Sequence, residues 1–170
     1  MSVPAQERWQ ARSMVITDRG IAATSQTLAS QAGAAILARG GSAVDAAIAA
    51  AAVLGVVEPM MCGLGGDLFA IHYDGKSGAL TGLNASGWSG RGQTLDAYRA
   101  KGLSGVPSTG IHTVTVPGAV DGWWQMHRKY GKLPWAELFR PAIHYARQGF
   151  AVTEVIAEDW ASGEGKLRGD

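Results

Sequence analysis

The chain has 170 residues, of which 46% are hydrophobic, so it is long enough and apolar enough to bury the core of one domain. Its 15 basic and 14 acidic residues are spread along the sequence and give a net charge of +1, which leaves no basic stripe for nucleic acid. The longest apolar run is shorter than the roughly 20 residues that a membrane span needs. The sequence therefore predicts neither a nucleic-acid partner nor a membrane-spanning segment, and its single cysteine excludes an internal disulfide.

Residues 1–12 are predicted to form a flexible polar arm, and residues 13–170 the folded part of the chain. The arm lacks the hydrophobic stretch of a secretory signal, which favours a cytoplasmic location and leaves a periplasmic or secreted one open. Ser2 would become a terminal nucleophile if Met1 were removed. A solvated arm does not hold a nucleophile rigidly, so we favour an arm without a catalytic role.

The helix predicted for residues 43–57 is the clearest element of the sequence. Ser42 and Asp45 follow a glycine pair, and both side chains can accept hydrogen bonds from the free amides of a first helical turn. No charged residue follows Asp45 inside the helix, which therefore has no polar face and is predicted to be buried on most sides. We interpret Asp45 as a helix cap and not as a catalytic acid.

A glycine-rich loop at residues 63–66 connects this helix to a predicted β-hairpin with strands at 68–73 and 79–84. Glycines in a loop can bind phosphate, but a dinucleotide fingerprint has its loop after a strand and before a helix. Here the order is reversed, which disfavours a nucleotide-binding domain. Close backbone packing is the favoured explanation of these glycines.

The remaining elements are predicted from apolar spacing and from turn residues. The first part of the chain is expected to hold two short strands and one helix, at 14–17, 21–24 and 28–38. The part after the hairpin is expected to hold a loop at 85–92, a short helix capped by Thr94, a third strand at 113–116, helices at 119–130 and 135–148, and a last helix from Thr153 that is cut at Gly163, Gly165 and Gly169.

Histidine and tryptophan residues give no sign of a metal or nucleic-acid site. The histidines have no zinc-like spacing with one another, with Cys62 or with carboxylates, and we expect each to lie on a strand or helix surface. Trp123, Trp124 and Trp135 occupy helical positions without basic neighbours, which favours core or subunit packing. No metal ligand and no cofactor is predicted.

Several segments of the chain occur in an order that resembles one family. They are residues 23–41, Gly40 to Ala47, Cys62 to Phe69, Val116 to Gly122, Lys129 to Trp135 and Pro141 to Val152. This set resembles the start of the large subunit of gamma-glutamyltranspeptidases, which are N-terminal-nucleophile hydrolases. The resemblance implies an α+β chain that forms part of a four-layer αββα fold, mostly helical with one β-hairpin, and incomplete at its C-terminal end.

The resemblance also implies a reaction. In this family a precursor cleaves itself and exposes a threonine at the start of a small subunit, whose hydroxyl attacks an amide while its own α-amine acts as the base. No threonine of this chain lies in the family's doubled-threonine context. We therefore expect no catalytic residue here, and expect the partner to be the small subunit that carries the nucleophile.

Candidate substrate-binding residues follow the second hairpin strand. True transpeptidases carry an arginine there that holds the substrate α-carboxylate, and aligning Leu83 and Asn84 with that strand end places Ala85 at its position. Related members without transpeptidase activity show an Asn-Gly/Ala-Ser-Gly-Arg pattern, whereas Trp88 replaces its arginine here. The candidates are Ser86, Trp88 and Arg91, with packing under the loop as the alternative for Trp88 and a solvated position as the alternative for Arg91.

The sequence therefore favours hydrolysis or acyl transfer at a small amide, through an acyl-enzyme formed on a threonine outside this chain. The first alternative is true gamma-glutamyl transfer or glutathione hydrolysis, which the missing arginine at position 85 disfavours. The alternative from another class is a non-catalytic interaction domain derived from the same family.

Overall fold

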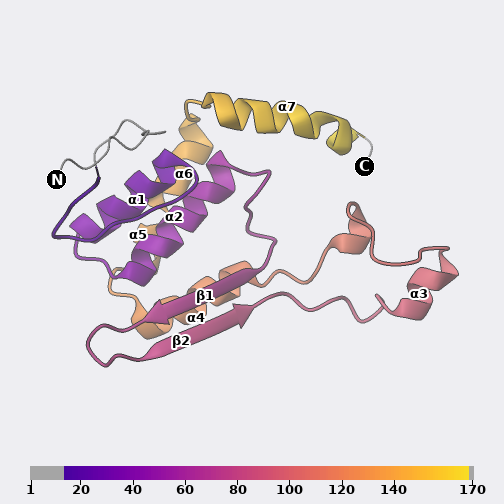
Figure 1. The fold of residues 1–170 in the computed structure, drawn as a ribbon, viewed down its shortest axis with the longest axis horizontal. Helices are drawn as coiled ribbons and strands as arrows, with labels where there is room; N and C mark the ends of the chain where they lie inside the picture. Colours follow the sequence, from indigo (N-terminus) through magenta and orange to yellow (C-terminus); the bar gives the residue numbers. More distant parts are fainter. Residues whose placement is uncertain (1–13, 169–170) are drawn as a thin grey trace, which may run out of the picture.

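The computed structural model describes residues 14–168, and the predicted arm, Ser2 and Gly169 lie outside this range. Within it, helices predominate and the only sheet has two strands. Figure 1 shows α1 and α2 side by side, the hairpin lying along α4, and the segment with α3 extending away from them. The elements are α1 (Thr27–Ala38), α2 (Ala43–Val57), β1 (Leu68–Tyr73), β2 (Leu80–Ala85), α3 (Leu95–Ala100), a 3-10 turn (Ile111–Thr113), α4 (Ala119–Tyr130), α5 (Trp135–Leu138), α6 (Arg140–Gln148) and α7 (Glu154–Arg168).

Helix α2 lies at the centre of the core, as its lack of a polar face predicts. It contacts α1, α4, α5 and α6, and Val53 and Val57 on it are fully buried. The many alanines of α2 allow neighbouring helices to approach closely, because a methyl side chain occupies little space between two helix axes. Ile36 of α1 and Leu138 of α5 fill the remaining volume around it.

Asp45 caps α2 and also attaches it to another part of the chain. The Ser42 hydroxyl accepts a hydrogen bond from the Asp45 amide at 3.1 Å, and the Asp45 carboxylate accepts one from the Ser42 amide at 2.9 Å, so the predicted cap is confirmed. The same carboxylate oxygen accepts the amides of Lys132 and Leu133 at 2.9 and 3.1 Å. Because Asp45 is fully buried, these bonds replace the water that this oxygen has lost, while the other oxygen, Oδ1, has no hydrogen-bond partner among the described residues.

His127 corrects the expectation that every histidine lies on a surface. Its side chain is only 14% exposed, and its Nε2 lies 2.8 Å from the Leu133 carbonyl oxygen and 3.7 Å from the Asp45 carboxylate. His72 is also half-buried, with its ring stacked on Tyr130 at 3.9 Å between centroids. The His72 ring lies between the hairpin and α4, and the His127 ring lies between α4, the start of α2 and the turn after α4. Alternation along one strand or helix does not reveal either contact.

The predicted β-hairpin is confirmed, and its second strand begins one residue later than expected. The strands are antiparallel, with Leu68 opposite Ala85 and Tyr73 opposite Leu80. Its inner face packs against the core through three side chains, Leu68, Ala70 and Leu83. Its outer face, formed by Phe69, Ile71, Tyr73 and Leu80, is 65–81% exposed and apolar.

The other predicted strands are wrong. Residues 14–17 and 21–24 have no regular secondary structure. Thr113 ends a 3-10 turn, and residues 114–116 follow it without forming a strand. Val116 donates one backbone hydrogen bond to Trp88 at 2.9 Å, but one bond is not a ladder. A strand needs a neighbouring strand, and β-type residues alone do not supply one.

Two helix boundaries also differ from the prediction. The helix expected over 135–148 divides into α5 and α6 at Phe139, because Pro141 has no amide to continue the hydrogen-bond ladder. Helix α7 is not cut at Gly163 or Gly165 and continues to Arg168. Each exposed glycine costs a helix only about 1 kcal/mol relative to alanine, which is not enough to end it.

Thr94 caps α3 as predicted, since its hydroxyl accepts the Ala97 amide at 3.2 Å.

We expect Asp45→Asn to lower the free energy of unfolding by about 2 kcal/mol. A neutral carbonyl oxygen accepts the three backbone amides less strongly than a carboxylate oxygen does, and the new NH2 group would be buried at the position of Oδ1, where residues 14–168 supply no hydrogen-bond partner. Chemical denaturation of the intact protein, followed by circular dichroism, measures the change. The control is Asp96→Asn, since the side chain of Asp96 is 93% exposed. Equal unfolding midpoints for the two variants would contradict the proposed role of Asp45.

Candidate functional site

Three segments that are distant in the sequence meet where β2 ends. The Gly87 amide donates to the Asp67 carboxylate at 2.7 Å, and the Val116 amide donates to the Trp88 carbonyl at 2.9 Å. The Gly66 carbonyl accepts the amides of Gly118 and Ala119 at 3.1 and 2.9 Å, at the start of α4. These bonds join the loop before β1, the loop after β2 and the segment that enters α4.

Glycines allow the backbones of these segments to approach each other. A side chain at Gly87 would overlap the carbonyl oxygen of Val116, and one at Gly118 would overlap the carbonyl oxygen of Ala85. Close packing was expected instead at residues 63–66, and this is wrong for Gly63 and Gly65, which have open space where a side chain would be. The predicted order of helix, glycine loop and strand is confirmed.

The junction surrounds a hollow of about 350 Å³. Its lining residues are Leu83, Asn84, Ala85, Ser86, Gly87, Trp88, Val116, Pro117, Gly118, Asp121 and Gln125. Asp121 is the one residue with an ionisable side chain in this lining set, and its carboxylate accepts a hydrogen bond from the Gln125 amide at 2.6 Å. The hollow therefore offers a carboxylate, a hydroxyl and an indole to a bound molecule.

The structure brings two of the three predicted substrate-binding residues together. Ser86 and Trp88 both line the hollow, and Trp88 is 85% exposed, so its ring is not packed under the loop. Arg91 lies in the turn that follows and is outside the lining set. Ala85 lies on the inner face of β2 against α4, where a side chain at Gly122 would be only 2.6 Å from its methyl group.

Sequence reasoning missed Asp67, Asp121 and Gln125 at this site. Asp121 and Gln125 are one turn apart on α4, and the predicted helix already places them on one face. No local pattern connects that face with residues 84–88, because the contact depends on how α4 packs against the hairpin. The signal that was available is the pair Gly87 and Gly118, each in a short turn-like segment.

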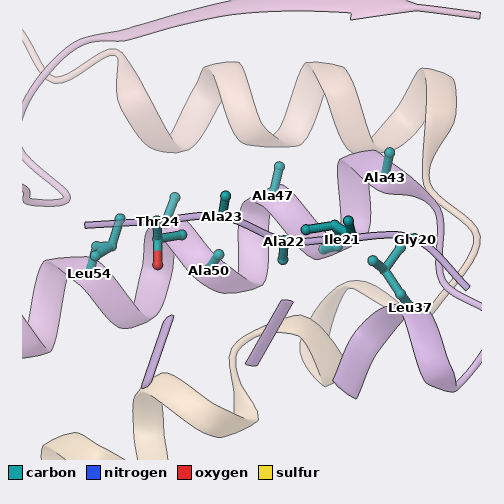
Figure 2. Close-up of a pocket in the computed structure, with 12 residues that line it drawn as sticks. Gly20, Ile21, Ala22, Ala23, Thr24, Leu37, Ala43, Ala47, Ala50 and Leu54 are labelled. Atoms are coloured by element: carbon teal, nitrogen blue, oxygen red, sulfur yellow. The ribbon is translucent and has the colours of Figure 1, made fainter. Parts of the chain in front are cut away.

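A second hollow, of about 420 Å³, lies between residues 20–24 and α2. Figure 2 shows the segment from Gly20 to Thr24 crossing the small side chains of α2, with Leu37 beside Gly20 and Leu54 beside Thr24. None of its lining residues is ionisable, and the Thr24 hydroxyl already donates to the Gln26 carbonyl at 2.6 Å. This hollow has the side chains of a packing surface and not those of a catalytic site.

Other reactive groups do not form a centre in the described part of the chain. Burial, together with the nearby Glu58 carboxylate, raises the pKa of the Cys62 thiol above its ordinary value, which disfavours the nucleophilic thiolate. Residues 14–168 contain no group of three or more His, Cys, Asp and Glu side chains that could hold a metal ion. No helix in that range is both long and apolar enough to cross a bilayer.

Comparison with known proteins identifies the family. A model of the family described as gamma-glutamyltranspeptidase matches residues 29–170. The chain is 44% identical over 140 residues to the glutathione hydrolase-like YwrD proenzyme of Bacillus subtilis (strain 168), covering 82% of this chain and 26% of that protein. It is 36% identical over 161 residues to the acylase ACY 1 proenzyme of Pseudomonas sp. (strain SE83), covering 89% of this chain and 29% of that protein.

Solved structures agree with these relatives. Cephalosporin acylase from Bacillus halodurans superposes with a TM-score of 0.87 at 41% identity, covering 99% of this chain and 31% of that one. Gamma-glutamyltranspeptidase from Helicobacter pylori superposes with a TM-score of 0.82 at 30% identity, covering 89% and 44%. The chain belongs to the gamma-glutamyltranspeptidase family, whose fold is that of the N-terminal-nucleophile hydrolases. It spans about a quarter of the length of the curated relatives above.

We expect Gly87→Ala to disrupt the junction, because the added methyl group overlaps the Val116 carbonyl and forces the two segments apart. Overpacking of this kind costs roughly 1–3 kcal/mol. Thermal unfolding of the intact protein measures the loss, and Gly92→Ala is the control, since a side chain at Gly92 meets nothing within 4 Å. An unchanged melting temperature in Gly87→Ala would show that the segments separate easily.

Proposed function

We propose that this chain is the amino-terminal part of the large subunit of an autoprocessed amidohydrolase or acyltransferase that acts on a small amide. Membership of the family supports the reaction class, and the word proenzyme in the names of its relatives supports processing of a precursor. The nucleophile is the terminal threonine of a small subunit from the same precursor. Residues 13–170 then form one portion of a single large subunit.

The proposed complete fold is the four-layer αββα arrangement. The apolar outer face of the hairpin supports it, because an exposed patch of this kind usually marks a surface that another part of a protein covers. The helices α1, α2 and α4 would form one outer layer, and the hairpin would belong to the sheet beneath it. A second sheet would then cover Phe69, Ile71, Tyr73 and Leu80.

The proposed reaction proceeds through an acyl-enzyme. The threonine hydroxyl attacks the substrate carbonyl, its α-amine takes the proton, and the leaving amine departs with a proton. Water or an acceptor amine then attacks the ester and releases the acyl group. Ser86 and Trp88 would hold that acyl group, the first through its hydroxyl and the second through its apolar ring. Arg91 would contact a substrate group that extends beyond the hollow.

The charge of the hollow is the observation that favours an acylase over a gamma-glutamyl enzyme. A gamma-glutamyl group carries an α-ammonium and an α-carboxylate. Asp121 could pair with the ammonium, but the described residues that line the hollow include no lysine or arginine to hold the carboxylate. Ala85 lines the hollow with a methyl group only. An acyl group without a carboxylate needs no such cation.

Gamma-glutamyl transfer or glutathione hydrolysis is the second candidate, because relatives named glutathione hydrolase are 35–37% identical to this chain. A non-catalytic interaction domain is the third candidate. The first experiment below distinguishes it from the two enzymes. The acylase and gamma-glutamyl candidates differ in one measurable property. The acylase candidate should prefer substrates whose acyl group has no free α-carboxylate, whereas the gamma-glutamyl candidate should prefer substrates whose acyl group has one.

Expression of the complete reading frame should give two polypeptides, the smaller one beginning with threonine. Intact mass and amino-terminal sequencing identify them, and replacement of that threonine by alanine should leave one unprocessed chain. A single chain from the unmodified gene, without amidase activity, would reject the enzyme and favour the interaction domain. With two chains, the ratio of kcat/KM for a neutral N-acyl amide and a gamma-glutamyl amide distinguishes the two enzymatic candidates.

We expect Arg91→Ala to lower kcat/KM by about tenfold, the effect of losing one charged hydrogen bond to a substrate. Lys101→Ala is the control, because it removes one positive charge from the exposed end of α3. The two variants should differ most with a substrate whose distal part carries a negative charge. Equal effects would remove Arg91 from the substrate site.

A further inference from the structure

Asp67 occupies the last position of the glycine loop, directly before β1. Its Oδ1 atom accepts the Gly87 amide at 2.7 Å and lies 3.5 Å from the Thr115 hydroxyl. Hydrogen bonds between a carboxylate and an amide are about twice as strong as neutral ones. One exposed side chain thus contacts both segments that border the hollow.

The other interactions of Asp67 do not account for its position. Among residues 14–168 it forms no ion pair within 4.0 Å, and it belongs to no cluster that could hold a metal ion. It does not cap a helix, because a strand follows it. Its shortest hydrogen bond is the one from the Gly87 amide, and the contact with the Thr115 hydroxyl is longer, at 3.5 Å.

Gly87 lies between the two residues that would contact the substrate. The Ser86 amide has only a local partner, the Asn84 side chain at 2.9 Å, while the Trp88 carbonyl accepts the Val116 amide at 2.9 Å. Residues 86–88 are therefore attached to distant parts of the chain at two consecutive points, Gly87 and Trp88. Without the Asp67 bond, the loop would keep its attachment at Trp88, and Ser86 would lose the nearest of the two attachments to distant parts of the chain.

We propose that Asp67 is a positioning residue of the acyl-binding hollow, and that its carboxylate fixes Ser86 and Trp88 opposite Asp121 through the Gly87 amide. This inference rests on the proposed function for its kinetic consequence, but not for its structural one. Asp67 does not contact the substrate. Its loss acts on substrate binding through the loop and leaves the threonine nucleophile in place.

The kinetic test uses the processed enzyme from the complete reading frame and a neutral N-acyl amide. We expect Asp67→Ala to raise KM about tenfold with kcat changed by less than about twofold, since the loop binds the acyl group and does not react. Asp67→Asn keeps an oxygen that accepts the Gly87 amide, so it should restore KM to within about threefold of the unmodified enzyme. Asp96→Ala, at an exposed carboxylate, is the control.

The structural test needs no activity. Hydrogen exchange followed by mass spectrometry should show faster exchange in peptides covering 85–92 of Asp67→Ala, by about tenfold, while peptides from α1 and α2 and the Asp67→Asn protein remain unchanged. Asp67→Ser, whose hydroxyl is too short to reach Gly87, replaces the alanine variant if that one does not fold.

The outcomes separate the two proposals. A protein without a terminal threonine or amidase activity rejects the proposed function, and the exchange data still decide whether Asp67 fixes the loop. Unchanged exchange and unchanged KM in Asp67→Ala would overturn the inference. So would a loss of kcat that Asp67→Asn shares, because that pattern would assign Asp67 a role in the chemistry.

Discussion

The buried carboxylate of Asp45 connects the two halves of the core. It begins α2, and it binds the backbone of the turn after α4, so it fixes the position of one helix relative to the other. A hydrophobic contact tolerates sliding, but a buried charge that needs several amides has one favourable position. The hairpin packs against α4, and the candidate site lies between them. The geometry of the site therefore depends on a residue outside its lining set.

A second constraint acts at the site itself, where backbone meets backbone. Gly87 and Gly118 leave no space for a side chain, so backbones approach closely there. One main-chain hydrogen bond joins the loop after β2 to the segment before α4, and two join the start of α4 to Gly66 in the loop before β1. Such a junction can keep its shape while the side chains around it change. Members of one family can then present different groups to a substrate from the same backbone. The predicted replacement of a family arginine by Trp88 would be one such change.

The sequence predicts those elements whose signal is local. The cap of α2, the hairpin turn and the cap of α3 each depend on side chains within a few residues, and all three are present in the structure. The strand expected at 113–116 fails because strand pairing depends on a distant partner. The predicted surface position of His127 is wrong for the same reason, because its burial depends on distant parts of the chain. Ser86 and Trp88 were found through a family pattern, whereas Asp67 and Asp121 join the site only through packing.

The two faces of the hairpin bear on how selectivity is divided between segments. Its inner face packs against the core, and its outer face carries exposed Phe69, Ile71 and Tyr73. The polar side chains in the middle of the hairpin, His72 and Thr81, contact Tyr130 of α4. The polar groups that the hairpin can offer to a bound molecule therefore come from the end of β2. That end is where Ser86 begins, directly after Ala85. The hollow lies beyond that strand end, and its described lining residues include one carboxylate, Asp121, and no cationic side chain. The proposed preference for an acyl group without a free carboxylate therefore depends on side chains that the end of β2 and α4 bring together.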